Sequence, residues 1–139
     1  MPLLRKDAKI ELLRKVPLFC HCSKSQLAAI AAQSDELAVP EGRTLTKQGA
    51  PGREFLVIFD GAAEVRKNGR KIATLGPGDF LGEIALITGG PRLATVTTTA
   101  PSRLLVVTDR AFRQVLQNVP AVQSNLLKAL SERLQNDSL

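Results

Sequence analysis

The middle of this 139-residue chain restricts its fold more than any other part. Between Leu37 and Thr108 the apolar residues come in short runs, and glycine, proline or a charged pair interrupts them every few residues. Short interrupted runs rich in Val, Ile, Leu, Phe and Thr are typical of β-strands. They predict strands at residues 36–39, 44–47, 54–59, 62–67, 71–75, 95–98 and 103–108, with one more near Phe80. About eight strands is the number of a double-sheet jelly roll.

One turn in this region can be assigned from the residues alone. Asn68 and Gly69 stand between two of the expected strands. Both central residues of a type I′ turn need a positive φ, which asparagine and glycine adopt most readily. We therefore expect a tight hairpin at this pair.

Helical periodicity precedes and follows the β region. Residues 7–16 carry apolar side chains at roughly helical spacing and end before Pro17, where a helix must break. Ser23 and Gln26 then have the spacing of a capping box before a second short helix. After the β region, Asp109 is expected to be the N-cap of a third helix.

Pro120 fits the first turn of the last helix. In that helix an apolar stripe repeats every four residues and consists of Val122, Leu126, Leu130 and Leu134. We thus expect a single α+β domain: helices in residues 1–34, an antiparallel β-roll in 35–108 and two helices in 109–137. The stripe is compatible with a lid over the roll, a structural helix or a dimer seam.

The formal net charge of +6 raises the question of an anionic partner. Basic residues are spread along the chain, with mild clusters at 5–15 and 66–71, and there is no Trp or Tyr on which nucleic-acid bases would stack. No apolar run reaches the length of a membrane span, and the first residues lack the apolar core of a signal peptide. We expect a cytoplasmic protein that binds no nucleic acid and is not inserted in a membrane.

Cys20, His21 and Cys22 are adjacent, and the sequence contains no other Cys or His. Three neighbouring residues do not close a tetrahedral zinc site, so no metal is expected. The two cysteines are also too close in sequence to staple a fold, and we expect free thiols. With one histidine and no nucleophile and base pair that can be named, we expect no enzymatic activity.

Residues 76–96 interrupt the β pattern and carry the candidate site. Residues 83–87 favour a single helical turn after Gly82, and such a turn presents backbone N–H groups that attract an anion. Pro91 fixes the approach of Arg92, whose guanidinium matches two phosphate oxygens. Glu83 would repel a phosphate but accepts a hydrogen bond from a sugar hydroxyl. These groups suit a ribose joined to a singly charged phosphate; the alternative is a simple salt bridge between Glu83 and Arg92.

The order of these residues resembles the phosphate-binding cassette of the cyclic-nucleotide-binding domain family. The family pattern is approximately Phe-Gly-Glu-Ile/Leu-Ala-Leu, a short spacer, and Pro-Arg-x-Ala-Thr/Ser-Val. Within residues 80–96 the chain has Leu81-Gly82-Glu83-Ile84-Ala85-Leu86, four further residues, and Pro91-Arg92-Leu93-Ala94-Thr95-Val96. The chain departs from the pattern at Leu81, where a phenylalanine is common, and at Leu93, where a small or hydroxyl residue is usual.

The resemblance implies roles for individual residues. Glu83 would hold the ribose 2′-hydroxyl and Arg92 the cyclic phosphate, while backbone N–H groups complete the cradle. If the apolar stripe of the last helix is a lid, Leu130 or Leu134 would cover the base. The implied ligand-binding set is Gly82, Glu83, Ile84, Ala85, Arg92, Leu93, Ala94, Leu130 and Leu134.

The resemblance also implies what the chain does. It would bind cAMP reversibly, and cGMP more weakly because Leu93 offers no hydroxyl to the guanine, without any cofactor. Movement of the last helix would relay occupancy to a protein partner or a second copy. Two alternatives concern context: a fragment of a catabolite-activator-type DNA-binding regulator, or the detached sensor of an enzyme or channel. A third is a degenerate domain that has kept the fold and lost the ligand.

Overall fold

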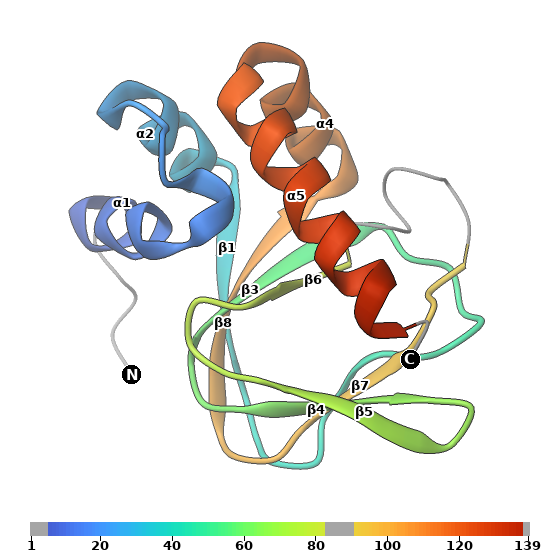
Figure 1. Ribbon diagram of the computed structural model, residues 1–139. Helices are drawn as coiled ribbons and strands as arrows, with labels where there is room; N and C mark the ends of the chain where they lie inside the picture. Colours follow the sequence, from blue (N-terminus) through green and yellow to red (C-terminus); the bar gives the residue numbers. More distant parts are fainter. Residues whose placement is uncertain (1–5, 83–90, 138–139) are drawn as a thin grey trace. The chain divides into compact units, whose positions relative to one another are not determined.

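The computed structural model describes residues 6–82 and 91–137, which form two compact units. One unit consists of Met1–Ser34 and Arg110–Leu139 and is helical, and the other is Asp35–Asp109 and holds the strands. The helical elements of the chain are α1 (Lys6–Lys15), the 3-10 turn η1 (Pro17–Phe19), α2 (Lys24–Ala32), α4 (Asp109–Asn118) and α5 (Pro120–Asp137) (Figure 1). None of the helices in the described residues is long and apolar enough to cross a membrane.

The start of α2 confirms the expected capping box. The Ser23 side chain accepts a hydrogen bond from the Gln26 N–H at 3.1 Å, and the Gln26 side chain accepts one from the Ser23 N–H at 2.7 Å. Two backbone donors that the helix leaves unpaired are thereby satisfied. The last helix begins at Pro120, as expected, whereas Asp109 is the first residue of α4 and not the flanking N-cap. The reason is that β8 runs directly into the helix without a connecting loop.

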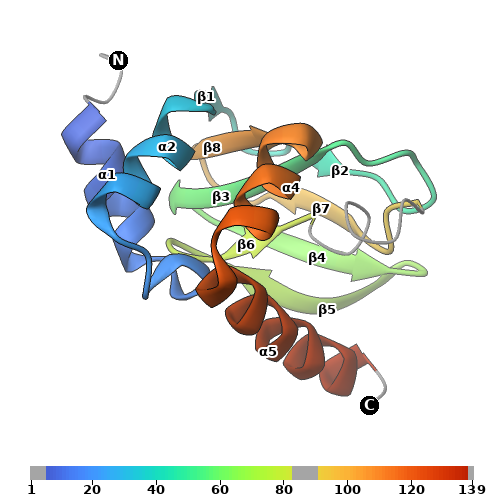
Figure 2. The same ribbon diagram turned by 90° about the horizontal axis from the view of Figure 1, so that it is seen from above.

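In residues 6–82 and 91–137, eight strands form two four-stranded sheets, which confirms the predicted double-sheet roll. The strands are β1 (Ser34–Val39), β2 (Thr44–Thr46), β3 (Glu54–Asp60), β4 (Ala63–Lys67), β5 (Arg70–Leu75), β6 (Phe80–Leu81), β7 (Thr95–Thr98) and β8 (Ser102–Thr108). One sheet has the order β1-β8-β3-β6 and the other β2-β7-β4-β5 (Figures 1 and 2). The predicted strand positions are correct to within two residues at each end.

The hairpin between β4 and β5 turns at the expected pair. Asn68 has a φ of 54° and Gly69 a φ of 80°, as a type I′ turn requires. The Arg66 Nη1 group donates to the Gly69 carbonyl at 3.2 Å. The turn is therefore held by its own backbone preference and by a neighbouring side chain.

The interior of the roll is apolar and draws on both sheets. Side chains of β1, β3, β6 and β8 meet those of β4 and β7 in one cluster of buried residues: Val39, Leu56, Ile58, Ala63, Leu81, Val96 and Leu104. Removal of apolar surface from water stabilises the roll by about 25 cal/mol for each Å² that is buried. Strand β5 takes little part, since its residues from Arg70 to Thr74 are all exposed.

Candidate functional site

Arg92 is fixed through its main chain by the loop between β2 and β3. Its N–H donates to the Ala50 carbonyl at 2.8 Å, and its carbonyl accepts from the Gly49 N–H at 2.9 Å. An isolated antiparallel bridge joins the neighbouring prolines, Pro51 and Pro91. The backbone of the candidate phosphate-binding residue is thus part of a short two-stranded ladder, although it lies outside the eight strands.

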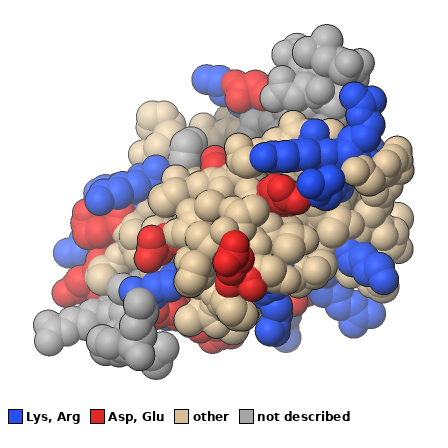
Figure 3. Space-filling view, turned by 90° about the horizontal axis from the view of Figure 1, so that it is seen from below, with Lys and Arg blue, Asp and Glu red and all other residues tan. Residues whose placement is uncertain are grey.

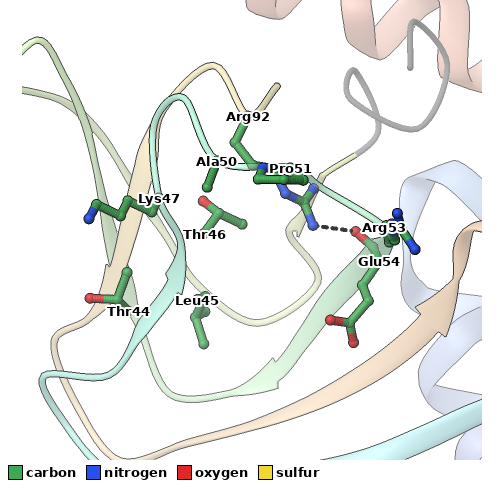
Figure 4. Close-up of a pocket in the computed structure, with 9 residues that line it drawn as sticks. All are labelled: Thr44, Leu45, Thr46, Lys47, Ala50, Pro51, Arg53, Glu54 and Arg92. Carbon is green, nitrogen blue, oxygen red and sulfur yellow. Dashed lines mark hydrogen bonds between the residues drawn. The ribbon is translucent and has the colours of Figure 1, made fainter. Parts of the chain in front are cut away.

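The Arg92 side chain lies in a narrow slot and is only 8% exposed. Its Nη2 donates to the main-chain carbonyl of Glu54 at 2.9 Å, and the Glu54 carboxylate points away from the guanidinium (Figure 4). A Cβ atom added to Gly52 would lie 2.3 Å from Nε of Arg92, and one added to Gly82 would lie 2.4 Å from Nη1. The guanidinium occupies space that a side chain at either position would fill, so both positions require glycine for this arrangement.

A cavity of about 410 Å³ opens beside this arginine (Figure 4). Its lining comes from β2, the loop that follows and the start of β3: Thr44, Leu45, Thr46, Lys47, Ala50, Pro51, Arg53, Glu54 and Arg92. The lining residues include three cationic ones, of which Arg92 is the buried one. The volume lies within the range of small-molecule sites.

The loop that holds Arg92 is anchored to two other elements by Gln48. Its side-chain amide donates to Oδ1 of Asn68 and accepts from the Asn68 N–H, both at 2.8 Å. Its main-chain N–H donates to Oγ1 of Thr95 at 3.0 Å. The β2–β3 loop is therefore tied to the β4–β5 turn on one side and to β7 on the other.

Four residues of the predicted ligand set can be placed in the strand unit. Gly82 follows β6 with a φ of 97°, a conformation that side chains rarely adopt. Leu93 is 39% exposed, and Ala94 accepts a hydrogen bond from Oγ1 of Thr46 at 3.0 Å. The Arg92 guanidinium occupies the space that a side chain at position 82 would take, so Gly82 and Arg92 lie side by side.

The other members of the set lie after Gly82 in the cassette and in α5. Glu83, Ile84 and Ala85 lie outside the described residues, and so does the alternative salt bridge from Glu83. Leu130 of α5 is half-buried in the helical unit. The surroundings of the Leu134 side chain are also outside what is described.

Sequence reasoning missed three residues that position Arg92: Gln48, Gly52 and Glu54. Gly49 and Gly52 do flank a short loop in the sequence, which is a weak turn signal. Glu54 acts through its carbonyl, however, and no side-chain pattern reports a carbonyl acceptor. The role of Gly52 depends on a residue 40 positions later.

The cysteines and the histidine form no site of their own in the described part of the chain. Cys20 and Cys22 are free thiols, the first exposed and the second buried. Burial, followed by the nearby Cys20, raises the pKa of the Cys22 thiol. The described residues contain no group of three His, Cys, Asp or Glu that could hold a metal ion.

This chain belongs to the cyclic nucleotide-binding domain family. The family model matches residues 36–119, which is more than half of the chain and covers the roll, the cassette and α4. Gly52, Glu54 and Gly82, which surround the Arg92 side chain, all lie within the matched residues.

Two curated relatives are regulatory proteins that are longer than this chain. The chain is 28% identical to a CRP-like cAMP-activated global transcriptional regulator of Mycobacterium tuberculosis over 90% of its own length and 58% of the relative's. It is 38% identical to a cAMP-dependent protein kinase regulatory subunit of Mycosarcoma maydis over 75% of its own length and 22% of the relative's. The chain therefore spans about three fifths of the first relative and about a fifth of the second.

Among solved structures, the regulatory domain of Toxoplasma gondii PKA crystallised with cAMP has a similar fold. The TM-score is 0.83 at 22% sequence identity, over 92% of this chain and 50% of that one. At this level of identity the likeness concerns the fold. Both curated relatives are regulatory proteins by name.

Proposed function

We propose that this domain is a reversible sensor that binds cAMP more tightly than cGMP and holds the cyclic phosphate with Arg92. The slot around Arg92 carries the proposal. A surface ion pair is worth little and needs no preformed slot, whereas here two glycines, a carbonyl and a backbone ladder fix one guanidinium at the side of a cavity. A guanidinium fixed in this way is pre-organised for bidentate contact with phosphate oxygens.

The remaining contacts follow from the family likeness. Glu83 accepts a hydrogen bond from the ribose 2′-hydroxyl, and the N–H groups of Gly82, Ala85, Leu93 and Ala94 complete the phosphate cradle. Leu130 or Leu134 of α5 covers the base. The names of the two curated relatives, one cAMP-activated and the other cAMP-dependent, support cAMP as the ligand.

Calorimetric titration with cAMP tests the role of Arg92. Arg92→Ala is expected to weaken binding by about 2–5 kcal/mol, roughly thirty-fold to several-thousand-fold in Kd, because the phosphate loses its cationic partner. Arg92→Lys keeps the charge but not the planar fork and should give an intermediate loss. Arg14→Ala removes an exposed guanidinium from α1 and is the matched control. Near-wild-type affinity of Arg92→Ala would remove the phosphate role.

A second titration tests the role of Glu83. Glu83→Ala should weaken cAMP binding but should hardly affect binding of 2′-deoxy-cAMP, which has no hydroxyl to offer. An equal loss for both ligands would mean that Glu83 acts on folding and not on the ribose.

Thermal melts separate this proposal from the degenerate domain. At a ligand concentration of one hundred times Kd the domain should gain about 2.7 kcal/mol of stability. An unchanged Tm with both cAMP and cGMP would favour a domain that has lost its ligand.

The proposal extends to signalling by α5. A ligand shifts an equilibrium between two positions of this helix only by its differential affinity for them. Hydrogen exchange of α5 amides should therefore change when cAMP binds. The match to the CRP-like regulator favours a transcriptional regulator as the context, and binding of the native full-length protein to DNA with and without cAMP tests that second candidate.

A further inference from the structure

The β4–β5 hairpin concentrates positive charge in a way that the ligand site does not use. Between Ala63 and Leu75 there are four basic residues and one acidic residue: Arg66, Lys67, Arg70, Lys71 and Glu64. Their net charge of +3 is half of the formal net charge of +6 for the whole chain. Figure 3, which views the molecule from the side of this sheet, shows Lys and Arg side chains gathered together on one part of the face.

The basic residues face one another across the hairpin. Arg66 is directly opposite Lys71, and Lys67 is directly opposite Arg70. Like charges at opposed positions of an antiparallel pair are destabilising. The Glu64 carboxylate binds Arg66 at 2.6 Å, and the pKa of this carboxyl is lowered by that hydrogen bond and by the charges of Arg66 and Lys71. This carboxylate thus acts on both Arg66 and Lys71.

Charge on an edge strand has an ordinary explanation, because lysines there prevent strands of different molecules from pairing. That explanation covers β5, which lies at the end of its sheet and pairs with β4 alone among the described strands. It does not cover Arg66, which is paired with β5 on one side and with β7 on the other; Lys67, the last residue of β4, is paired with β5. Protection of the edge needs no cations on an interior strand opposite those of the edge.

The edge itself is open and rigidly held. All residues of β5 from Arg70 to Thr74 are exposed, including Ile72 at 45%. The turn has the backbone geometry of a tight hairpin, and Gln48 clamps Asn68 through two hydrogen bonds. A strand that is already ordered loses little conformational entropy when another strand pairs with it.

We propose that the β5 edge docks an extended acidic segment of a partner protein as an additional strand of the sheet. Carboxylates opposite Arg70 and Lys71 would relieve the repulsion within the hairpin, and an apolar residue would cover Ile72. The backbone groups on the outer side of β5, before and after the register shift at Ile72, supply hydrogen bonds. A nucleic acid fits less well, because the hairpin contains no aromatic residue for base stacking.

Fluorescence anisotropy with a labelled peptide tests this docking. The probe is a short peptide of valine and threonine with two adjacent glutamates at its centre, added to the whole chain. The control probes replace both glutamates with glutamine, or place a proline beside them so that the peptide cannot pair as a strand. We expect binding of the first probe, weakened by added salt, and at least about tenfold weaker binding of both controls.

Protein variants provide the second arm. Arg70→Glu combined with Lys71→Glu should weaken peptide binding about tenfold or more. The Tm of this variant should equal or exceed that of the wild type, because each new carboxylate faces a cation on β4. Lys24→Glu combined with Lys128→Glu makes the same change in net charge at exposed positions of α2 and α5 and should bind the peptide normally.

Hydrogen exchange distinguishes strand addition from unspecific attraction. Bound peptide should slow the exchange of β5 amides that have no partner in β4. The proposal is overturned if the acidic peptide does not bind, if the glutamine peptide binds equally well, or if β5 amides gain no protection. It is also overturned if duplex DNA or phosphatidylserine vesicles bind more tightly than the peptide and lose that binding in the Arg70 and Lys71 variant.

Discussion

Gly52 forms one wall of the slot that holds Arg92: a Cβ atom on this glycine would lie 2.3 Å from Nε and 2.6 Å from Cδ and Cζ of the arginine. The backbone of Gly52 is not in the left-handed region, so alanine is compatible with its conformation. The atoms that must move belong to a flexible side chain. A substitution here therefore acts on the ligand site more than on the fold.

Gly52→Ala is accordingly expected to weaken cAMP binding and to lower Tm less than a substitution at Gly82. Displacement of the guanidinium from its hydrogen bond with Glu54 should raise Kd by about tenfold, or roughly 1.4 kcal/mol. Calorimetry and a thermal melt of the same preparation measure the two effects. Unchanged affinity would show that Arg92 can bind phosphate from another position.

Gly82→Ala is expected to lower both the affinity for cAMP and the stability of the fold. Gly82 has a φ of 97°, and a Cβ atom there would approach the Glu54 carbonyl oxygen to 2.5 Å as well as Nη1 of Arg92. The backbone cannot yield as a side chain can, so the free energy of unfolding should fall by about 1–3 kcal/mol. Ligand affinity should fall too. Urea denaturation and calorimetry test this variant, and wild-type stability would contradict the argument.

The clamp between Gln48 and Asn68 offers a third test. Gln48→Ala removes both side-chain hydrogen bonds and frees the β2–β3 loop, whose Ala50 carbonyl accepts the Arg92 N–H. The affinity for cAMP should therefore fall several-fold, which corresponds to a loss of about 0.5–1.5 kcal/mol in binding free energy. Asn68→Gly keeps the positive φ of the turn and removes only one of the two bonds.

The double variant decides whether the two residues act together. If the clamp positions Arg92, adding Asn68→Gly to Gln48→Ala should cost almost nothing further, because the shared interaction is already lost. Additive losses in Kd would show that Gln48 and Asn68 act separately.

The sequence was sufficient for the parts of this fold that depend on local chemistry. Asn68 and Gly69 specify their turn because few other residues adopt its dihedral angles, and Ser23 and Gln26 specify their cap through reciprocal hydrogen bonds. Arg92 was singled out because it directly follows Pro91 in a stretch that resembles the cassette of the family. These features involve neighbours in the chain.

The slot around Arg92 could not be predicted because its parts are distant in sequence. Gly52 and Glu54 contact the arginine across about forty residues, and they do so with a missing side chain and a main-chain oxygen. The cross-strand opposition of Arg66 and Lys71 likewise depends on a register shift between Val65 and Arg66, which the composition of the hairpin does not reveal.

Leu93 sets the expected choice of base. In the family, domains that prefer cGMP commonly have a threonine directly after the cassette arginine, where its hydroxyl meets the guanine amino group. Leu93 is 39% exposed in this structure, so a side chain at this position is accessible. Leu93→Thr should narrow the preference for cAMP over cGMP by about 0.5–1.5 kcal/mol, the value of one hydrogen bond. Competition titrations measure the ratio, and tighter cGMP binding by the wild type would contradict the prediction.

Helix α5 has two halves with different environments. Val122 is fully buried and Leu126 is 4% exposed, and the Asn125 side chain donates to the Leu18 carbonyl at 3.1 Å. The first half is therefore part of the core of the helical unit. In the second half Leu127 is 70% exposed and Leu130 is half-buried. In the predicted apolar stripe, Val122 and Leu126 therefore stabilise the helical unit, whereas Leu130 is accessible enough to contact a ligand or a second copy of the chain.

Two truncations separate these roles. Removal of all residues after Pro120 deletes two buried side chains and the Asn125 hydrogen bond, and it should leave the protein insoluble or molten. Removal of residues after Lys128 keeps those contacts and should leave a folded domain. If the deleted segment is a lid over the base, this shorter domain should release cAMP faster and bind it more weakly by about 1–3 kcal/mol, the value of one or two buried apolar side chains. Stopped-flow dissociation and calorimetry measure both quantities. If the segment is a dimer seam, sedimentation should instead show a change of oligomeric state while Kd stays constant.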